Sequence, residues 1–207
     1  MKIAILKGSS TNNVLDTFSH QLARGVDGIG HESAVLDVAR DDVLADLINT
    51  LRDHSFDAVV SFNGILGDVV GPDQRNLMEH AGIPFIAWLV DHPAHHYHRL
   101  AAPNEFRWTL CTSKDHVAFL DAAGVSGLWQ HLHAAADPWE TTPKAFNERR
   151  MPVLLAATWM REPDKFWEHI QSDTTRAIIE NVIERVMDDG SVSVTTAFGD
   201  VLASKGL

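Results

Sequence analysis

Short apolar runs alternate with segments of helical periodicity along the first two thirds of the chain. The apolar runs predict strands at residues 2–7, 32–39, 56–62, 85–90, 107–112 and 127–133. Between them, apolar residues recur three and four positions apart, which is typical of amphipathic helices. Because strand and helix alternate with short links, the pattern predicts an α/β fold with a Rossmann-like, doubly wound parallel sheet.

Helices are predicted in most of the links between these strands. They are expected at about residues 14–26, 42–51, 74–80 and 114–123. Ser113 is the expected cap of the last of them, because a serine side chain can accept a hydrogen bond from a free amide of the first turn. Trp88, Trp108 and Trp129 lie within predicted strands, so we expect them to pack in the core.

The alternation ends near Asp137, and we expect a Rossmann-like domain at residues 1–140. Residues 141–207 are predicted to form a linker, an additional strand at 151–159 and C-terminal helices at 164–169 and 174–187. This segment is too short for a second complete α/β domain. We therefore expect a helical C-terminal appendage.

Residues 82–93 contain the most informative predicted strand. Pro84 cannot continue a preceding helix. The unbroken apolar run at 85–90 is typical of a strand that is covered on both faces of a parallel sheet. Asp91 and His92 follow at its carboxyl end, which is the edge where open α/β sheets bind ligands.

Composition and charge limit the classes of partner. An apolar fraction of 45% suffices for a core, and a formal net charge of -11 argues against a nucleic-acid surface and against binding to an anionic membrane. No apolar run approaches the ~20 residues that span a bilayer, and we see no secretory signal, so we expect a cytoplasmic protein. The single cysteine, Cys111, lies in a predicted buried strand, where we expect a structural thiol rather than a nucleophile.

Four segments of the predicted domain share a pattern with a known family. They are residues 57–64 (DAVVSFNG), 82–93 (GIPFIAWLVDHP), 112–116 (TSKDH) and 131–138 (HLHAAADP). In these segments the chain resembles the N-terminal domain of CgeB-like, spore-protein-type GT-B glycosyltransferases, over residues 1–160. Two departures are that Ala156, Ala157 and Thr158 stand where the family has an F-x-G element, and His133 stands where proline is common.

This resemblance implies a GT-B architecture, in which two Rossmann-like domains face each other across a cleft. It implies that the chain is the acceptor-side half, with a nucleotide-sugar and an acceptor small molecule or glycan as ligands. The C-terminal donor domain is missing or abbreviated here, which implies a separate donor domain or a homo-oligomer as partner.

Asp91 and His92 are the candidate catalytic residues. Transfer of a sugar to a hydroxyl needs a base that takes the acceptor proton, and a carboxylate or an imidazole at the strand end could do this. The alternative is that Asp91 caps the next helix and His92 packs under a loop.

Other polar residues near predicted strand ends are candidate substrate contacts. The small polar turn after the first strand could present amides to an anion, although the dinucleotide fingerprint G-x-G-x-x-G is absent. The Asn-Gly turn after the 56–62 strand allows close approach of a ligand. Ordinary turns are the alternative for both. The candidates are Gly8, Ser9, Ser10, Asn63, Gly64, Asp68, His95, His131 and Asp137.

The histidine cluster that follows Asp91 allows a metal site as an alternative. His92 and His96 would share one face of a helix that begins near residue 94, and His95 and His98 would share another. A catalytic zinc site needs a third protein ligand. Candidates for it are Asp91, His131 and His133. The spacing is not a recurrent zinc pattern, so we assign no metal ligand and expect no cofactor.

Three hypotheses follow from the sequence. The first is a glycosyltransferase, or its acceptor-side half, with Asp91 or His92 as base. The second is a non-catalytic Rossmann-like binding module or partner subunit, which the missing donor domain favours. The third is a metal-dependent hydrolase that uses the cluster between His92 and His98.

Overall fold

The computed structural model describes residues 1–10, 13–39, 47, 49–51, 53, 56–71, 75–125, 127–132, 145, 148 and 165–207. The chain divides into two compact units, unit 1 at Met1–Ala136 and unit 2 at Asp137–Leu207. The strand predicted at 151–159 lies outside the described residues, as do His133 and Asp137.

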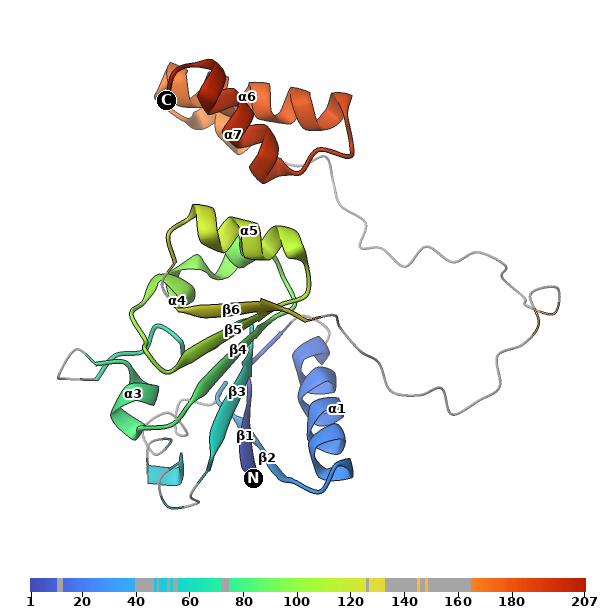
Figure 1. Cartoon of the computed structure of the whole chain (residues 1–207), viewed down its shortest axis with the longest axis vertical. Coiled ribbons are helices and arrows are strands. Elements are labelled where there is room, and N and C mark those ends of the chain that lie inside the picture. The colour runs from blue at the N-terminus through green and yellow to red at the C-terminus, as the bar shows by residue number, and fades with distance from the viewer. Residues whose placement is uncertain are drawn as a thin grey trace. The chain divides into compact units, whose positions relative to one another are not determined.

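Unit 1 is built on one parallel sheet of six strands in the order β2-β1-β3-β4-β5-β6 (Figure 1). The strands are β1 (Lys2–Lys7), β2 (Glu32–Asp37), β3 (Ala58–Phe62), β4 (Phe85–Leu89), β5 (Arg107–Cys111) and β6 (Leu128–His131). The predicted α/β class with a doubly wound parallel sheet is confirmed. The strand order reverses between β1 and β3, so the topological switch point lies between their carboxyl ends.

Alternate residues of the central strands enter two different cores, because successive side chains of a strand point to opposite faces of the sheet. In β1, Ala4 and Leu6 belong to a large core that also contains Phe85, Ala87 and Leu89 of β4. A smaller core on the other face contains Ile3, Ile5, Val26 and Val60. Burial on both faces explains why the central strands are unbroken apolar runs.

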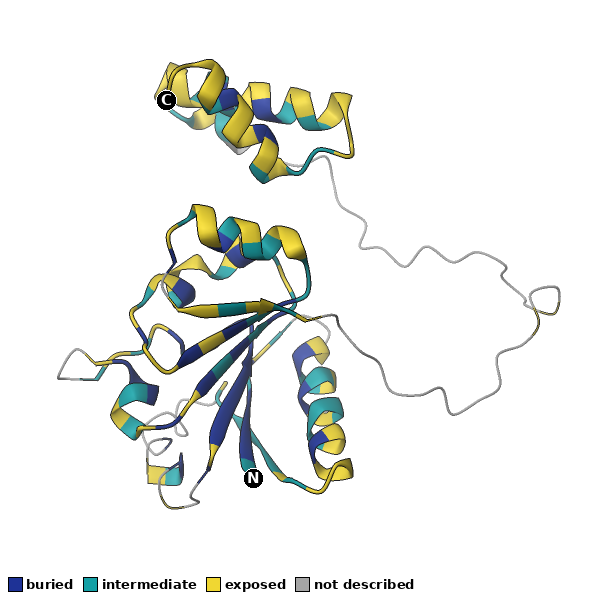
Figure 2. Cartoon of the chain, in the orientation of Figure 1, coloured by how far each residue is buried: buried dark blue, intermediate teal, exposed yellow. Residues whose placement is uncertain are grey.

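Helix α1 (Val14–Gly28) packs against β1 and β2 and covers the smaller core. The ring of its Phe18 lies 5.6 Å from that of Phe62 at the end of β3. On the same face, farther along the sheet, Trp108 is 55% exposed and Leu128 is 63% exposed. Figure 2 shows β1, β3 and β4 buried along most of their length and β6 exposed or half-buried. The prediction that Trp108 packs in the core is therefore wrong, because among the described residues α1 alone covers this face.

The other helices of unit 1 cover the large core. They are α3 (Leu77–Ala81), the 3-10 turn η2 (Pro93–His96), α4 (Tyr97–Ala101) and α5 (Lys114–Ala122). The predicted cap of α5 is confirmed, since the Ser113 hydroxyl accepts a hydrogen bond from the Asp115 amide at 3.2 Å. Of the helix predicted at 42–51, residues 47, 49–51 and 53 are described and are helical, and Leu47 and Leu51 are buried in the large core.

Unit 2 is helical in its described part, as predicted. It contains the 3-10 turn η4 (Phe166–His169) and the helices α6 (Asp173–Asp188) and α7 (Val194–Ser204). The two helices share a small core of Ile178, Val182, Ala197 and Val201. Among the described residues, no helix of either unit is both long enough and apolar enough to cross a membrane.

The loop after β3 folds tightly against α4. Gly67 donates its amide to the carbonyl of Gly64 at 2.8 Å. A Cβ at position 67 would lie 2.9 Å from that carbonyl oxygen and 3.0 Å from the carbonyl oxygen of Arg99. Both neighbours are backbone atoms, so the loop has no room for a side chain here.

We predict that Gly67→Ala lowers the free energy of unfolding by about 1–3 kcal/mol, because the loop and α4 must move apart. The matched control is Gly25→Ala in α1, where an added Cβ meets nothing within 4 Å. This control should stabilise the protein by about 0.5–1 kcal/mol, because alanine is the better helix former. Urea unfolding of both variants measures the difference, and equal stabilities would contradict the close approach at Gly67.

Candidate functional site

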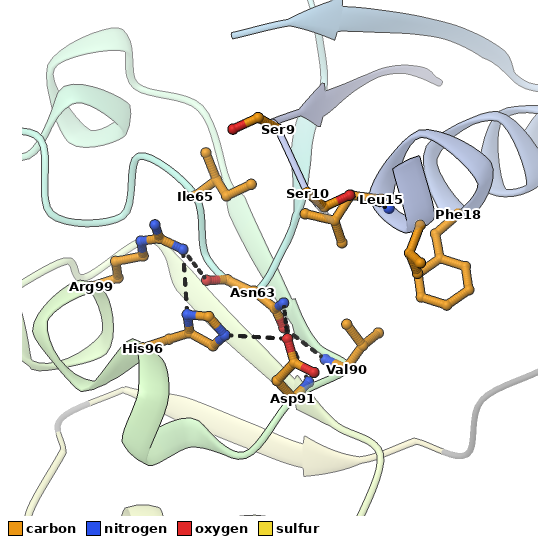
Figure 3. Close-up of a pocket in the computed structure, with 11 residues that line it drawn as sticks. Ser9, Ser10, Leu15, Phe18, Asn63, Ile65, Val90, Asp91, His96 and Arg99 are labelled. Atoms are coloured by element: carbon orange, nitrogen blue, oxygen red, sulfur yellow. Dashed lines mark hydrogen bonds and ion pairs between the residues drawn. The ribbon is translucent and has the colours of Figure 1, made fainter. Parts of the chain in front are cut away.

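A cavity of about 570 Å³ opens at the carboxyl ends of β1, β3 and β4. This position is the switch point of the sheet, where open α/β folds bind their ligands, and the volume is in the range of small-molecule sites. Figure 3 shows the lining side chains. They are Ser9, Ser10, Val14, Leu15, Phe18, Asn63, Ile65, Val90, Asp91, His96 and Arg99.

Asn63 joins the ends of β3 and β4 beneath this cavity. It is 5% exposed and has a left-handed backbone conformation with φ 55°, which asparagine tolerates better than most residues. The backbone amide of Asn63 donates to the Trp88 carbonyl at 2.8 Å. Its side-chain oxygen accepts from the amides of Val90 and Asp91 at 3.0 and 3.2 Å. These two backbone donors fix which end of the side-chain amide is oxygen.

The side-chain nitrogen of Asn63 orients Asp91. The Asn63 Nδ2 donates to Asp91 Oδ2 at 2.7 Å, a short distance that is typical of a bond to a charged acceptor. The Asp91 side chain is 60% exposed, and its Oδ1 has no hydrogen-bond partner in the described part of the chain. One carboxylate oxygen is therefore held in place while the other remains available to a ligand.

His96 lies between Asp91 and Arg99 (Figure 3). Its Nδ1 is 3.4 Å from Arg99 Nη1, and its Nε2 is 3.6 Å from Asp91 Oδ2. A guanidinium can only donate, so Nδ1 is the acceptor and the proton of the neutral ring sits on Nε2, toward Asp91. Burial, and next the Arg99 charge, lower the pKa of His96, while Asp91 acts in the opposite direction. The imidazole is therefore neutral at pH 7.

Arg99 is held at its position by contacts from both sides. Its Nη1 donates to the Asn63 carbonyl at 3.2 Å. The buried Arg107 donates from its Nη1 to the carbonyls of Arg99 and Ala102, at 3.2 and 2.8 Å. A cation at the carboxyl end of a helix is favourable there. Arg107 therefore anchors α4, the helix that brings Arg99 to the cavity.

The turn after β1 forms the opposite side of the cavity. Ser9 and Ser10, two of the candidate substrate contacts, both line it, but they differ in their bonding. The Ser10 hydroxyl accepts from the Leu15 amide at 3.0 Å and so caps α1, whereas the exposed Ser9 hydroxyl has no partner among the described residues. Gly8 is buried behind the cavity, where its missing side chain leaves room for Ile65.

His92, the second candidate base, lies outside the lining of the cavity in the described part of the chain. Its Nδ1 accepts from the Ala94 amide at 3.2 Å and caps η2. Its ring packs edge-on against His116 and Phe119, each at 5.0 Å between centroids. Capping and packing were the alternative roles for Asp91 and His92, and His92 has both of them.

The other candidate contacts that the structure describes also lie outside this lining. Gly64, with φ 62°, packs beside Ala87, Leu100 and Arg99. Asp68 Oδ2 is 3.7 Å from His98 Nε2, and both side chains are exposed. His95 is exposed, with its ring 6.5 Å from that of His92. His131 ends β6, in register with Cys111 of β5. Asp137 is outside the described residues.

The histidines do not gather into a metal site among the described residues, which contain no group of three or more His, Cys, Asp or Glu side chains able to hold an ion. Cys111 is fully buried, and desolvation raises the pKa of its thiol to about 11. A thiol with so high a pKa is protonated at neutral pH, which agrees with a structural role and not with nucleophilic chemistry.

The two basic residues of the cavity, His96 and Arg99, were not predicted as substrate contacts from the sequence. The sequence indicated His96 only as a possible metal ligand. The spacing of three between the two residues is a usable signal, because side chains three apart lie on one face of a helical turn. A search for cations in the helical segment that follows a strand-end carboxylate would have found Arg99.

We predict that Asn63→Asp destabilises the protein by about 1–3 kcal/mol at pH 7, because a carboxylate replaces the donor that faces Asp91 Oδ2. The backbone conformation tolerates either residue. Two adjacent carboxylates raise the folded-state pKa of one of them, so the penalty should shrink as pH falls and that group is protonated. Urea unfolding at about pH 7 and pH 4.5 measures this, and a penalty that grows with acid would contradict the contact.

We predict that the wild-type protein loses stability as pH falls from about 7 to 5.5, partly through His92 and His116. Burial is the main cause that lowers the pKa of both imidazoles. The unfolded state then takes up protons first, so acid favours unfolding until pH reaches the lower folded-state pKa. His116→Gln should make this decrease shallower in urea unfolding. His169→Gln removes an exposed imidazole as control, and equal effects of both changes would contradict the assignment.

Comparisons with known proteins give no family assignment. No protein-family model matches the chain, and no curated protein matches it. The resemblance to CgeB-like glycosyltransferases therefore stays a prediction. We infer the function from the cavity and from the residues that line it.

Proposed function

We propose that unit 1 is the acceptor-side domain of a glycosyltransferase and that it binds a hydroxyl compound in the cavity. The observation that supports this most strongly is the state of Asp91. Asn63 holds one of its carboxylate oxygens at 2.7 Å, and the other has no partner among the described residues. A fixed carboxylate with a free oxygen, in a cavity at the switch point, suits a general base.

The proposed step is transfer of a sugar from a nucleotide-sugar to the bound hydroxyl. The hydroxyl oxygen forms a bond to the anomeric carbon, and the bond from that carbon to the phosphate oxygen of the nucleotide breaks. The nucleotide leaves with the electron pair of that bond. The hydroxyl proton moves to Asp91 Oδ1, so the charge of the carboxylate passes to the leaving phosphate.

His96 and Arg99 support this role of Asp91. The proton on His96 Nε2 faces Asp91 Oδ2, with 3.6 Å between the two heavy atoms, a distance that a small rotation of either side chain can close. Because the imidazole stays neutral, Asp91 is not held in a full ion pair with His96. Arg99 fixes the tautomer of His96 through the contact at Nδ1.

The nucleotide-sugar needs a binding domain besides unit 1. In the CgeB-like glycosyltransferases that the chain resembles, a second Rossmann-like domain mostly binds the donor. Residues 165–207 of unit 2 contain two helices and a 3-10 turn and no strand. We propose that residues outside the described part, or a separate polypeptide, bind the donor.

A second candidate function is a non-catalytic binding module. The same cavity would then hold a small ligand without transfer, and Asp91 would contribute a hydrogen bond only. The observation that favours this alternative is the absence of a donor-binding sheet from residues 165–207. The two candidate functions differ in the expected effect of removing the Asp91 carboxylate: a transferase loses turnover, whereas a binding module has no turnover to lose and can change only in ligand affinity.

We predict that Asp91→Asn lowers transfer about 100- to 10,000-fold, because the amide cannot take the proton. Affinity for the acceptor should change by less than about threefold, since an amide oxygen still accepts a hydrogen bond. Transfer is measured by mass spectrometry with a panel of nucleotide-sugars and hydroxyl acceptors, with a donor-binding domain supplied. Binding is measured by saturation-transfer NMR.

Asp27→Asn is the matched control, because Asp27 is an exposed carboxylate near the far end of α1. Its transfer rate should equal that of the wild-type protein. Transfer by Asp91→Asn at the wild-type rate would refute the role of Asp91 as base. Binding of acceptors without transfer by the wild-type protein, across the panel, would favour the binding module.

A further inference from the structure

Arg99 is a cation without a carboxylate partner in the cavity. Its side chain forms no ion pair in the described part of the chain, and the only hydrogen-bonding contacts of that side chain there are those of Nη1 with the Asn63 carbonyl and His96 Nδ1. Lys7, at the end of β1, differs in this respect, since its Nζ is 2.6 Å from Asp16 and 3.4 Å from Asp37. The half-buried guanidinium of Arg99 therefore has no counter-ion among the described residues, although the chain has a net charge of -11.

Two nitrogens of the Arg99 guanidinium remain for a ligand. Nη2 and Nε have no partner among the described residues, and Arg99 lines the cavity. Nη2 and Nε form one edge of the planar group, and this edge can bond two oxygens of a carboxylate or phosphate at once. Ser9, across the cavity at the end of β1, offers a hydroxyl that is likewise unused.

The contact of Arg99 with Asn63 does not by itself account for an arginine here. One donor to a carbonyl would be supplied by a lysine, whose ammonium is a compact point charge. The contact with Nη1 instead holds the guanidinium plane and leaves the opposite edge free. A charged group that is already immobilised loses less conformational entropy when it binds a ligand.

We infer that the cavity recognises a hydroxyl compound that also carries an oxyanion, with the oxyanion on Arg99 and the hydroxyl near Asp91. This inference rests on the proposed function, because it names the class of acceptor for the same cavity. His96 separates the two charged groups, with its Nδ1 at 3.4 Å from Arg99 and its Nε2 at 3.6 Å from Asp91. A ligand whose anionic group and hydroxyl are separated by about the width of the His96 ring can contact both Arg99 and Asp91. Sugar phosphates and sugar acids have this chemistry.

The test is titration of the full chain with four probes, followed by amide chemical shifts in NMR and by calorimetry. The probes are inorganic phosphate, glucose 6-phosphate, glucuronate and glucose. We expect both sugar anions to bind at least about tenfold more tightly than glucose, because a bond to a charged group adds to affinity. The phosphate and carboxylate arms distinguish which oxyanion the cavity prefers. Amides of Ser9, Asn63 and Arg99 should shift.

Arg99→Met should lower the affinity for glucose 6-phosphate about tenfold to a hundredfold. The affinity for glucose, which has no anionic group for Arg99 to bind, should not fall by a comparable factor. Arg99→Lys is the second variant, because it keeps the charge and should lose affinity by a smaller factor. Thermal unfolding monitors the fold of both, since Arg99 also contacts Asn63. Asp91→Asn should bind the sugar anions at least as tightly as the wild-type protein, because it removes a negative charge from the cavity.

Glucose bound as tightly as both anions, or full anion binding by folded Arg99→Met, would overturn the inference. Failure of the inference and failure of the proposed function have different signatures. If transfer to neutral acceptors depends on Asp91 and the sugar anions do not bind, the inference of an anion site is wrong and the proposed transferase function stands. If anion binding depends on Arg99 and Asp91→Asn does not change transfer, the anion site stands and the role of Asp91 as base is wrong.

Discussion

The site depends on the way Asn63 is bonded at the end of β3. Its side chain accepts from the amides of Val90 and Asp91 and donates to the Asp91 carboxylate, while its backbone carbonyl accepts from Arg99. One buried asparagine thus fixes the carboxyl end of β4 and the orientation of the carboxylate through its side chain, and the position of the guanidinium through its backbone carbonyl. A buried polar group that makes several hydrogen bonds is rigid, because movement would leave some of these bonds unmade.

This arrangement explains why the carboxylate and the guanidinium can occupy one cavity without neutralising each other. His96 stands between them as a neutral ring, with its Nδ1 toward Arg99 and its Nε2 toward Asp91. Burial lowers the pKa of that ring, so the separation persists at neutral pH. The cavity therefore presents an acceptor and a donor of opposite charge, each with unused hydrogen-bonding capacity, to whatever ligand enters it.

The class of fold could be predicted from the sequence, because burial on both faces imposes an unbroken apolar run such as 85–90. The edge that contains the site followed from the same pattern, since a parallel sheet brings the strand ends that precede Ser9, Asn63 and Asp91 together. Side-chain orientation did not follow. Asp91 and His92 are adjacent, yet only Asp91 lines the cavity. Trp108 is exposed because coverage of a sheet face depends on distant helices, which local periodicity does not encode.

The central claim is that Asn63 holds Asp91 in position to meet a ligand hydroxyl while Arg99 binds the anion of the same ligand. A crystal structure of the full chain with glucose 6-phosphate tests this most directly. The account predicts a sugar hydroxyl about 2.6–3.2 Å from Asp91 Oδ1, within reach for proton transfer, and phosphate oxygens on the free edge of Arg99. A sugar phosphate bound elsewhere, or bound in the cavity with Asp91 turned away from Asn63, would contradict it.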